Sequence, residues 1–264
     1  MKKTSKQTDY KNWVPMSMIY GYGGATLFFL ILFLFFVSGK AFFSQIMSVV
    51  FGLASSVSLV VTVWSVFAYR AFSYAGRIRL SQRIIENIAG YIHVEKDMKI
   101  LDVGCGSGAL AIACAKQNPQ AMVVGVDRWG AEYSNYSKHL CECNAQAEHL
   151  ENIRFVEGNA IKLDFPDQTF DAVTSNYVYH NIVGHDKQAL LKESLRVLKK
   201  GGFFAIHDLM SARRYGDITA FMKELKAEGY EKVELSNTVD GKVITSKEAT
   251  FLMLKESRLL YGKK

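Results

Sequence analysis

The stretch that decides the fold is Lys99-Ile-Leu-Asp-Val-Gly-Cys-Gly-Ser-Gly-Ala-Leu, residues 99–110. A short apolar run, typical of a buried strand, leads into a loop with three glycines and then into a helical pattern. Glycines permit a tight turn and a close approach of the backbone to a ligand, and a helix N-terminus presents unpaired N–H groups. An acid, Asp127, ends the next strand pattern, where a carboxylate can accept hydrogen bonds from ribose hydroxyls. The stretch therefore predicts a site for a ligand with a nucleoside part.

Two kinds of ligand fit this loop, and Asp102 separates them. Gly104, Gly106 and Ala109 satisfy the spacing of the dinucleotide-binding fingerprint. An acid two residues before the first glycine, however, would lie near the pyrophosphate of a dinucleotide and would repel it. The same carboxylate suits a ligand that carries an ammonium group there. The residues therefore favour S-adenosylmethionine over NAD, and an NAD-dependent oxidoreductase is the less favoured interpretation.

Outward from this loop, apolar strand patterns alternate with amphipathic helical patterns. This alternation predicts an α/β fold in which helices cover both faces of a mostly parallel sheet. The chain shows no internal repeat, low-complexity segment or long linker. The expected strands are residues 99–103, 122–127, 153–157, 170–175, 202–207, 232–235 and 250–255, and the expected helices are residues 77–90, 107–117, 130–148, 186–199 and 214–228.

Several segments, in order and over about residues 80–260, resemble class I S-adenosylmethionine-dependent methyltransferases. Ordered segments at family-like spacing are more specific than one glycine loop. The resemblance implies a Rossmann-like, doubly wound and mostly parallel seven-stranded sheet, and an enzyme that transfers the methyl group of S-adenosylmethionine. The segments are LDVGCGSG (101–108), VVGVDRW (123–129), FVEGNA (155–160), FPDQTFDAVTSNYVYHNI (165–182) and LRVLKKGGFFAIHD (195–208).

The resemblance implies a role for each matching position of the cofactor site. Asp102 would meet the methionine end of the cofactor, and Asp127 would accept from the ribose hydroxyls. Where the family often has Gly-Asp-Ala, this chain has Asn159, whose amide oxygen would accept from the adenine amine without charge assistance. Besides these three, the expected cofactor-binding residues are Gly104, Cys105, Gly106, Gly108, Arg128, Ala160 and Asn176, with Trp129 beside the adenine.

The catalytic candidates follow from where a doubly wound sheet binds its ligands, at the carboxyl ends of its strands. Methyl transfer from a sulfonium depends mainly on alignment, and a general base is needed only where the acceptor begins protonated. We predict His180 as the best base, since an imidazole titrates near neutral pH, with a satisfied structural histidine as its alternative role. His207, beside Asp208, and Tyr177 are the further candidates. Tyr177 and Tyr179 alternate, so we expect at most one to face the pocket.

Before the α/β pattern lie two long uncharged stretches, residues 12–39 and 41–69, separated by Lys40. They hold 28 and 29 residues, and each exceeds the roughly 20 apolar residues that cross a bilayer. The segment TLFFLILFLFFV (26–37) is apolar on every side of a helix, as a lipid-facing span must be. We predict an anchor domain of residues 1–76 with transmembrane helices at about 17–38 and 42–69, followed by a methyltransferase domain of residues 77–264.

Small residues in the second stretch mark the expected face between the two helices. Ser44, Ser48, Gly52 and Ser56 recur every four positions, so they form one stripe that another backbone can approach closely. Two alternatives to a membrane hairpin stay open. A buried helical hairpin in a soluble protein rarely carries uncharged runs of this length, and a second span directly after the first disfavours a cleaved signal peptide.

The positive charge of the chain lies around this hairpin. Residues 1–83 carry nine basic residues and one acid, whereas the remainder carries 23 basic and 24 acidic residues, within a net charge of +7. Four lysines precede the first stretch, four arginines follow the second, and only Lys40 lies between them. By the positive-inside rule, we expect both termini and the catalytic domain on the cytoplasmic side of the cell membrane. The nearly neutral domain gives no indication of a nucleic-acid partner.

The four cysteines do not have the spacing of a metal site. His139, Cys141, Cys143 and His149 lack paired Cys-x-x-Cys spacing, and on a helix Cys141 and Cys143 would point to nearly opposite sides. We therefore expect no metal. Unpaired cysteines suit a reducing compartment better than a disulfide framework.

These observations favour a membrane-anchored methyltransferase that acts on a small, lipid-like or hydrophobic acceptor. A hairpin anchor is most useful if the acceptor itself lies in the membrane. The alternatives are the same reaction on a soluble small molecule or a protein, with the hairpin used for location, and a cofactor-binding membrane module without catalysis. The departure at Asn159 supports the last, and intact Asp102 and Asp127 argue against it.

Overall fold

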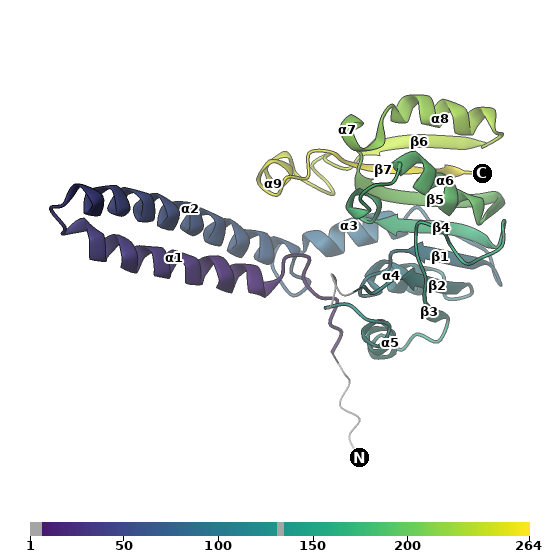
Figure 1. Cartoon of the computed structure of the whole chain (residues 1–264). Helices are drawn as coiled ribbons and strands as arrows, with labels where there is room; N and C mark the ends of the chain where they lie inside the picture. Colours follow the sequence, from purple (N-terminus) through teal and green to yellow (C-terminus); the bar gives the residue numbers. More distant parts are fainter. Residues whose placement is uncertain (1–6, 131–134) are drawn as a thin grey trace, which may run out of the picture. The chain divides into compact units, whose positions relative to one another are not determined.

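The computed structural model describes residues 7–130 and 135–264 (Figure 1). The chain divides into two compact units, Asn12–Ser81 and a second unit that joins Met1–Lys11 to Gln82–Lys264. We call the first the hairpin unit and the second the sheet unit, and describe each by itself.

The hairpin unit holds two long apolar helices, α1 (Met16–Val37) and α2 (Phe42–Phe72). Both are long and apolar enough to cross a membrane. The two helices pack against each other, and the rings of Phe36 and Phe51 stack with centroids 5.7 Å apart. Neither helix contains a charged residue before Arg70 in the last turn of α2.

The contact between the two helices follows the predicted stripe of small residues only in part. Ser44 donates to a backbone carbonyl of α1 (3.0 Å), and a Cβ at Gly52 would lie 3.2 Å from the ring of Phe33 on α1, whereas Ser56 is exposed. Further along α2 the contact passes through Ser55, whose hydroxyl donates to the carbonyl oxygen of Thr26 (3.2 Å). A four-residue repeat rotates slowly around a helix of 3.6 residues per turn, so the stripe leaves the face toward α1 after Gly52.

The sheet unit contains, within the described residues, a seven-stranded sheet in the order β3-β2-β1-β4-β5-β7-β6. All neighbouring strands are parallel except for the pairs that β7 makes with β5 and β6. This confirms the predicted Rossmann-like, doubly wound fold. The strands are β1 (Lys99–Val103), β2 (Met122–Asp127), β3 (Ile153–Glu157), β4 (Phe170–Asn176), β5 (Leu198–Leu209), β6 (Lys232–Asn237) and β7 (Ser257–Lys263).

The last strand was predicted at the wrong place. Residues 250–255 form an apolar run, but Thr250 belongs to helix α9 (Ser246–Phe251), and the strand follows as β7. Thr245 and Glu248 form a capping box, in which each side chain accepts from the backbone of the other residue. This cap starts a helix and overrides the strand-like run that follows.

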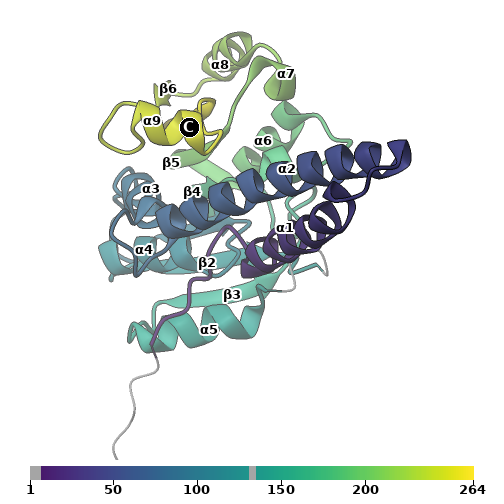
Figure 2. The same cartoon turned by 90° about the vertical axis from the view of Figure 1, so that its left-hand side faces the viewer.

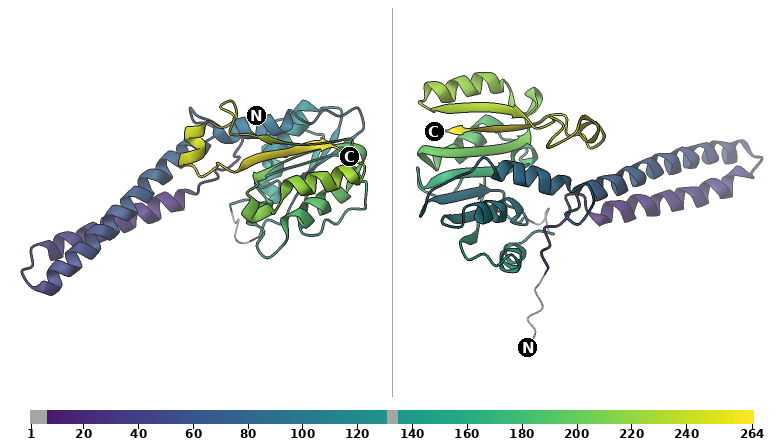
Figure 3. Two further views of the ribbon diagram at one scale, coloured as in Figure 1. Left: turned by 90° about the horizontal axis from the view of Figure 1, so that it is seen from above. Right: turned by 180° about the vertical axis from the view of Figure 1, so that it is seen from behind.

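Helices cover both faces of the sheet. The crossover from β1 to β2 and the crossover from β4 to β5 lead in opposite directions along the sheet, so right-handed connections place α4 and α6 on opposite faces (Figures 2 and 3). The helices of this unit are α3 (Leu80–Ala89), which begins at its boundary, α4 (Ala109–Gln117), α5 (Lys138–Ala147), α6 (Lys187–Arg196), α7 (Ala212–Tyr215), α8 (Ile218–Ala227) and α9, with a 3₁₀ turn η2 (Tyr179–Asn181).

Two predicted helices have different bounds in the structure. The helix expected from residue 130 begins at Lys138, because Ser137 caps it by accepting from the backbone N–H of Leu140 (3.1 Å); residues 131–134 lie outside the described residues. The helix expected over 214–228 is divided into α7 and α8. Gly216 has a positive φ (66°) between them, and Asp217 caps α8.

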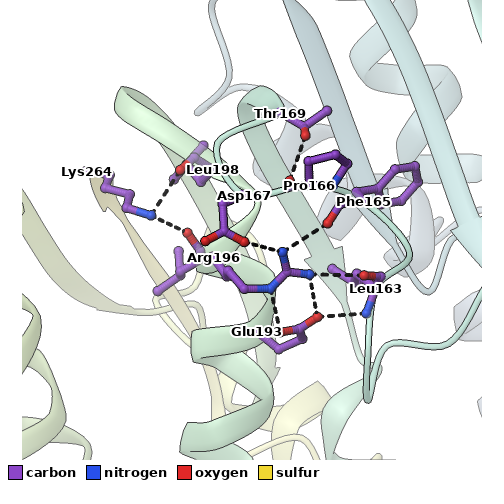
Figure 4. A network of polar contacts seen from close by, with 10 residues as sticks. Leu163, Phe165, Pro166, Asp167, Thr169, Glu193, Arg196, Leu198 and Lys264 are labelled. Atoms are coloured by element: carbon purple, nitrogen blue, oxygen red, sulfur yellow. Dashed lines mark hydrogen bonds and ion pairs between the residues drawn. The ribbon is translucent and has the colours of Figure 1, made fainter.

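An arginine on α6 holds the long loop between β3 and β4 (Figure 4). Arg196 donates to the carbonyl oxygens of Leu163 (3.0 Å) and Phe165 (2.9 Å) and forms ion pairs with Glu193 and Asp167. The glutamate in turn accepts from the backbone N–H of Leu163 (2.8 Å). The guanidinium has five donors in a fixed fork, which lets one side chain fix several carbonyls of an irregular loop.

The registers of the central strands bring the chemistry to one edge of the sheet. Asp102 of β1 lies opposite Thr174 of β4, and Asn176 of β4 lies opposite His207 of β5. Because these strands are parallel, the loops after all three leave the sheet at the same edge, where doubly wound folds bind their ligands.

Candidate active site

The glycine-rich loop between β1 and α4 takes the conformation that only glycine adopts freely. Gly104, Gly106 and Gly108 have φ values of 71°, 56° and 82°. Position 104 also has no room for a side chain, because a Cβ there would lie 2.3 Å from a methyl carbon of Val178. The backbone N–H groups of Gly104 and Cys105 both donate to the carbonyl oxygen of Val126 (2.8 and 3.1 Å), which fixes the loop to β2.

Asp127, at the end of β2, organises the far side of this loop. Its two carboxylate oxygens accept from the backbone N–H groups of Gly106 (2.8 Å) and Trp129 (3.0 Å). The indole N–H of Trp129 donates to the carbonyl oxygen of Gly106 (3.0 Å), so Asp127, Trp129 and Gly106 are joined in one closed set of hydrogen bonds. Each carboxylate oxygen retains a lone pair. Asp127 therefore shapes the loop and can still accept from the hydroxyls of a ribose.

Asp102 is a buried acid with an incomplete set of partners. It is 1% exposed, and its Oδ1 accepts from the hydroxyl of Thr174 (3.1 Å). Within the described residues its Oδ2 has no hydrogen-bond partner. Burial raises the pKa of Asp102 to about 8, although the hydrogen bonds from Thr174 and the backbone of Ala111 lower it. An orphaned carboxylate oxygen beside the glycine loop fits the ammonium group of an amino-acid ligand.

This arrangement predicts that cofactor binding releases a proton. With a pKa near 8, Asp102 is mostly protonated at pH 7 in the free protein, and a nearby ammonium lowers that pKa because it favours the charged carboxylate. Binding of S-adenosylhomocysteine at pH 7 should therefore release protons, up to one per site. Calorimetry in buffers of different ionisation enthalpy measures this number.

The matched control for the proton release is Asp102→Asn, which keeps the shape and cannot titrate. The binding enthalpy of that variant should not depend on the buffer. An equal buffer dependence in both proteins would show that Asp102 does not meet the ammonium.

The residues expected around the adenine lie after β2 and β3. The backbone N–H of Gly158 donates to the carbonyl oxygen of Asp127 (2.9 Å), so the segment that follows β3 lies beside the end of β2. Asn159 is exposed, and its Oδ1 accepts from the backbone N–H of Ile161 (3.0 Å). Arg128 is exposed, and Ala160 is partly buried against the core. The Asn159 oxygen keeps a second lone pair for an adenine amine.

His180 and Asp208 form a pair that the sequence analysis did not predict. His180 Nδ1 lies 2.5 Å from Asp208 Oδ1, and the His180 backbone N–H donates to Oδ2 of the same carboxylate (3.1 Å). The Asp208 side chain is fully buried and the His180 side chain is 17% exposed. Burial alone would raise the pKa of Asp208, but the contact with His180 and the backbone N–H of Leu209 outweigh it, and the net shift is downward. Asp208 is thus ionised and Nδ1 carries the proton.

His207, the other predicted histidine, has both ring nitrogens engaged. Its Nδ1 donates to Asn176 Oδ1 (2.8 Å), and its Nε2 accepts from the hydroxyl of Thr238 (2.9 Å). The side chain is wholly buried, and burial lowers the pKa of His207 to about 4. A neutral imidazole with both nitrogens satisfied holds Asn176 in place, whereas among the described residues His180 Nε2 has no hydrogen-bond partner and can meet an acceptor.

The two tyrosines after β4 have different surroundings. Tyr179 is wholly buried and its hydroxyl bonds to Ser194 (2.7 Å), so it packs in the core. Tyr177 is only partly buried, has a positive φ (55°), and its hydroxyl lies 2.7 Å from that of Ser257 on β7. Its ring lies 4.7 Å from that of His207 and 6.0 Å from that of His180, centroid to centroid. Tyr177 is therefore the one beside the candidate base.

The cysteines act within the fold. Cys141 is buried and donates to the carbonyl oxygen of Gly106 (3.1 Å), while Cys143 lies on the other side of α5, 3.5 Å from His139. Burial raises the pKa of the Cys105 thiol well above its usual range. Residues 7–130 and 135–264 contain no group of three or more His, Cys, Asp or Glu that could hold a metal ion.

A comparison with known protein families agrees with this geometry. A family model described as a methyltransferase domain matches residues 94–256. The chain belongs to this family. Residues 94–256 therefore form a methyltransferase domain of the S-adenosylmethionine-dependent kind, and S-adenosylmethionine is the cofactor of this domain. Membership also removes the NAD-dependent oxidoreductase from consideration.

Curated relatives of this methyltransferase cover the same region. A demethylmenaquinone methyltransferase of Geobacillus kaustophilus is 36% identical over 118 residues, which are 44% of this chain and 47% of the relative. An uncharacterized methyltransferase of Schizosaccharomyces pombe is 36% identical over 126 residues, which are 47% of this chain and 45% of the relative. The match thus spans about half the length of these relatives.

Solved structures share the fold of this methyltransferase at low sequence identity. A geranyl diphosphate methyltransferase in complex with GPP and sinefungin has a TM-score of 0.51 and 16% identity, and covers 74% of this chain and 82% of its own. The [4+2]-cyclase SpnF has a TM-score of 0.51 and 18% identity, and covers 70% of this chain and 81% of its own.

Proposed function

We propose that this methyltransferase modifies a small, lipid-soluble acceptor whose nucleophilic atom begins protonated, at the cytoplasmic face of the cell membrane. The observation that carries the proposal is the His180–Asp208 pair at the carboxyl edge of the sheet. A base held in this way has a use only where the acceptor must lose a proton, such as a phenolic or enolic hydroxyl. An acceptor with a free amine or thiolate would need no such base.

The pair acts by leaving one ring nitrogen free for the acceptor. Asp208 accepts the Nδ1 proton and fixes the tautomer, so Nε2 carries the lone pair. Nε2 would take the proton of the acceptor hydroxyl as that oxygen attacks the methyl carbon, and His180 would then pass the proton to water. S-adenosylmethionine, when bound, would supply the methyl group and keep the electron pair of the broken carbon–sulfur bond as S-adenosylhomocysteine. The buried carboxylate stabilises the imidazolium in between.

Other residues of the chain position the reactants. S-adenosylmethionine, when bound, supplies an activated methyl group, so alignment provides much of the acceleration. Asp102 and the glycine loop would hold its methionine end, and Asp127 its ribose. Asn176 is fixed by His207 at the end of β4, the strand that lies between β1 and β5 in the sheet. The aromatic face of Tyr177 would stabilise the positive charge of the sulfonium.

Two observations support a lipid-soluble acceptor. Helices α1 and α2 are apolar enough to lie in a membrane. The matched curated relatives include demethylmenaquinone methyltransferases, which by name act on demethylmenaquinone. Together they favour a quinol-like acceptor with an acidic hydroxyl, which agrees with the requirement for a base.

The proposed topology is a transmembrane hairpin with both ends on the cytoplasmic side. At 1.5 Å per residue, 22 residues of α1 and 31 of α2 span about 33 and 46 Å, enough for a hydrocarbon core of about 30 Å. The basic residues flank the two helices and not the turn between them. This asymmetry supports a cytoplasmic location for the active site.

Transfer of a radioactive methyl group tests the proposed function. Membranes that contain the full chain are incubated with S-adenosylmethionine labelled in the methyl group, then extracted with organic solvent. We expect the label in a lipid-soluble product. Labelling should require that the acceptor is present in its reduced form, which carries the hydroxyl group. Label confined to protein or to water-soluble products would contradict the lipid-soluble acceptor and favour a hairpin used for location alone.

A further inference from the structure

A segment that precedes the first apolar helix lies against the helix that supports the cofactor loop. We call residues 7–11 the N-terminal strap; they belong to the sheet unit. The backbone N–H of Asp9 donates to Asn144 Oδ1 (2.7 Å), and Asn144 Nδ2 donates back to the carbonyl oxygen of Asp9 (3.0 Å). The hydroxyl of Tyr10 donates to the carboxylate of Glu148 (2.8 Å). The strap is therefore held on α5 and on the residue just after it by three hydrogen bonds.

Asn144 also reaches the glycine-rich loop. The second hydrogen of its Nδ2 goes to the carbonyl oxygen of Ser107 (3.0 Å), so both N–H donors of the amide are used. Cys141, one turn earlier on the same face of α5, donates to the carbonyl oxygen of Gly106. Two side chains of α5 thus hold consecutive carbonyls of the loop, and one of them holds the strap as well.

Asn144 is 2% exposed, which makes its bonds costly to lose. A buried polar group that loses its hydrogen-bond partner costs the full free energy of its desolvation. Neighbouring groups then shift to provide a new partner. If the strap leaves α5, the Asn144 amide loses two of its three bonds and is no longer fixed in the orientation that holds Ser107. Gly106 in this loop has a positive φ. The bonds to the carbonyl oxygens of Gly106 and Ser107 help the loop to keep this conformation.

We propose that Asn144 is a positioning residue that makes cofactor affinity depend on docking of the N-terminal strap. The coupling is reciprocal, because a ligand that favours the ordered loop must also favour the docked strap. The strap and the cofactor loop share one buried amide, and in sequence the strap precedes α1, which begins at Met16. The proposal concerns the cofactor half of the site and holds whatever the acceptor is.

The test uses the full chain purified in detergent and S-adenosylhomocysteine as the probe. Asn144→Asp keeps the acceptor for the Asp9 N–H and removes both donors. We expect its dissociation constant for the probe, measured by calorimetry, to rise about 5- to 20-fold, while kcat at saturating cofactor changes less than about twofold. Tyr10→Phe removes the bond of the strap to Glu148 and leaves the Asn144 amide in place, and it should raise the dissociation constant about 2- to 5-fold.

The matched control is Asn118→Asp. Asn118 is 1% exposed and makes three hydrogen bonds of the same kind, to Val94, Ile92 and Cys114, away from the strap. If Asn144 had only a structural role, both aspartate variants would have a lower melting temperature, and their folded forms would bind the probe with the same affinity. Equal probe affinity in the two variants, or wild-type affinity in Tyr10→Phe, would overturn the proposal.

Hydrogen exchange gives a second readout that does not depend on activity. The Asp9 amide is the donor of the strap bond to Asn144. Reciprocity predicts that the probe slows its exchange in the wild-type chain and does so less in Asn144→Asp. If the exchange rate of the Asp9 amide in the wild-type chain were the same with and without the probe, the coupling would be contradicted.

Discussion

Replacement of His180 by alanine is expected to lower kcat by about 10²- to 10⁴-fold, with little change in the affinity for S-adenosylhomocysteine. The imidazole is the proposed base, and it is not one of the residues expected to hold the cofactor. Asp208→Asn should have a comparable effect on kcat, because an amide at that position can donate to Nδ1 and favour the tautomer that blocks Nε2. Steady-state kinetics with calorimetry of the probe separates the two quantities.

The control for this prediction is His185→Ala, which removes an exposed histidine five residues further along the same loop. It should retain the kcat of the wild-type chain. If His180→Ala kept most of its turnover, the acceptor would not need a base, and the argument for a hydroxyl-bearing acceptor would fail. A loss of probe affinity equal to the loss of kcat would instead indicate a general disturbance of the site.

Gly104→Ala is expected to abolish measurable cofactor binding and to destabilise the sheet unit by about 3 kcal/mol or more. Two effects combine. A side chain at φ = 71° is strained, and its Cβ would lie 2.3 Å from Val178, which must move. Val178 lies two residues before His180, so its displacement would also disturb the base. Denaturant unfolding and calorimetry of the probe measure the two losses.

Gly229→Ala isolates the backbone strain. Gly229 has a φ of 98°, and a Cβ there would meet nothing within 4 Å. That variant should lose only about 1–2 kcal/mol and should bind the probe as the wild-type chain does. Equal stability losses in the two variants would show that the contact with Val178 relaxes freely and is not what requires glycine at position 104.

The sequence could predict those parts of the fold and site that depend on short-range patterns. The glycine loop, Asp102 and Asp127 are recognisable because strand, turn and acid follow one another at a fixed spacing. The alternation of strands and helices predicted the doubly wound sheet. It failed at residues 250–255, where a capping box overrode an apolar run, and at 214–228, where Gly216 and Asp217 divide one expected helix into two.

The parts of the site that could not be predicted depend on contacts between residues that are distant in the sequence. His180 was predicted, but its pairing with Asp208 joins the turn after β4 to the end of β5, 28 residues away. His207 and His180 look equivalent in sequence, and only the structure shows that Thr238 and Asn176 satisfy one of them. The contact of Asp9 with Asn144 spans 135 residues and has no local signal.

The partition of transferred methyl label tests the central claim most directly. In membranes that contain the wild-type chain, the label should enter an organic-extractable product of low molecular mass, and it should be absent with Asp208→Asn, which retains the cofactor loop. Label that appears only in protein or in the aqueous phase, or that enters lipid equally with Asp208→Asn, would contradict the claim that His180 and Asp208 deprotonate a lipid-soluble acceptor.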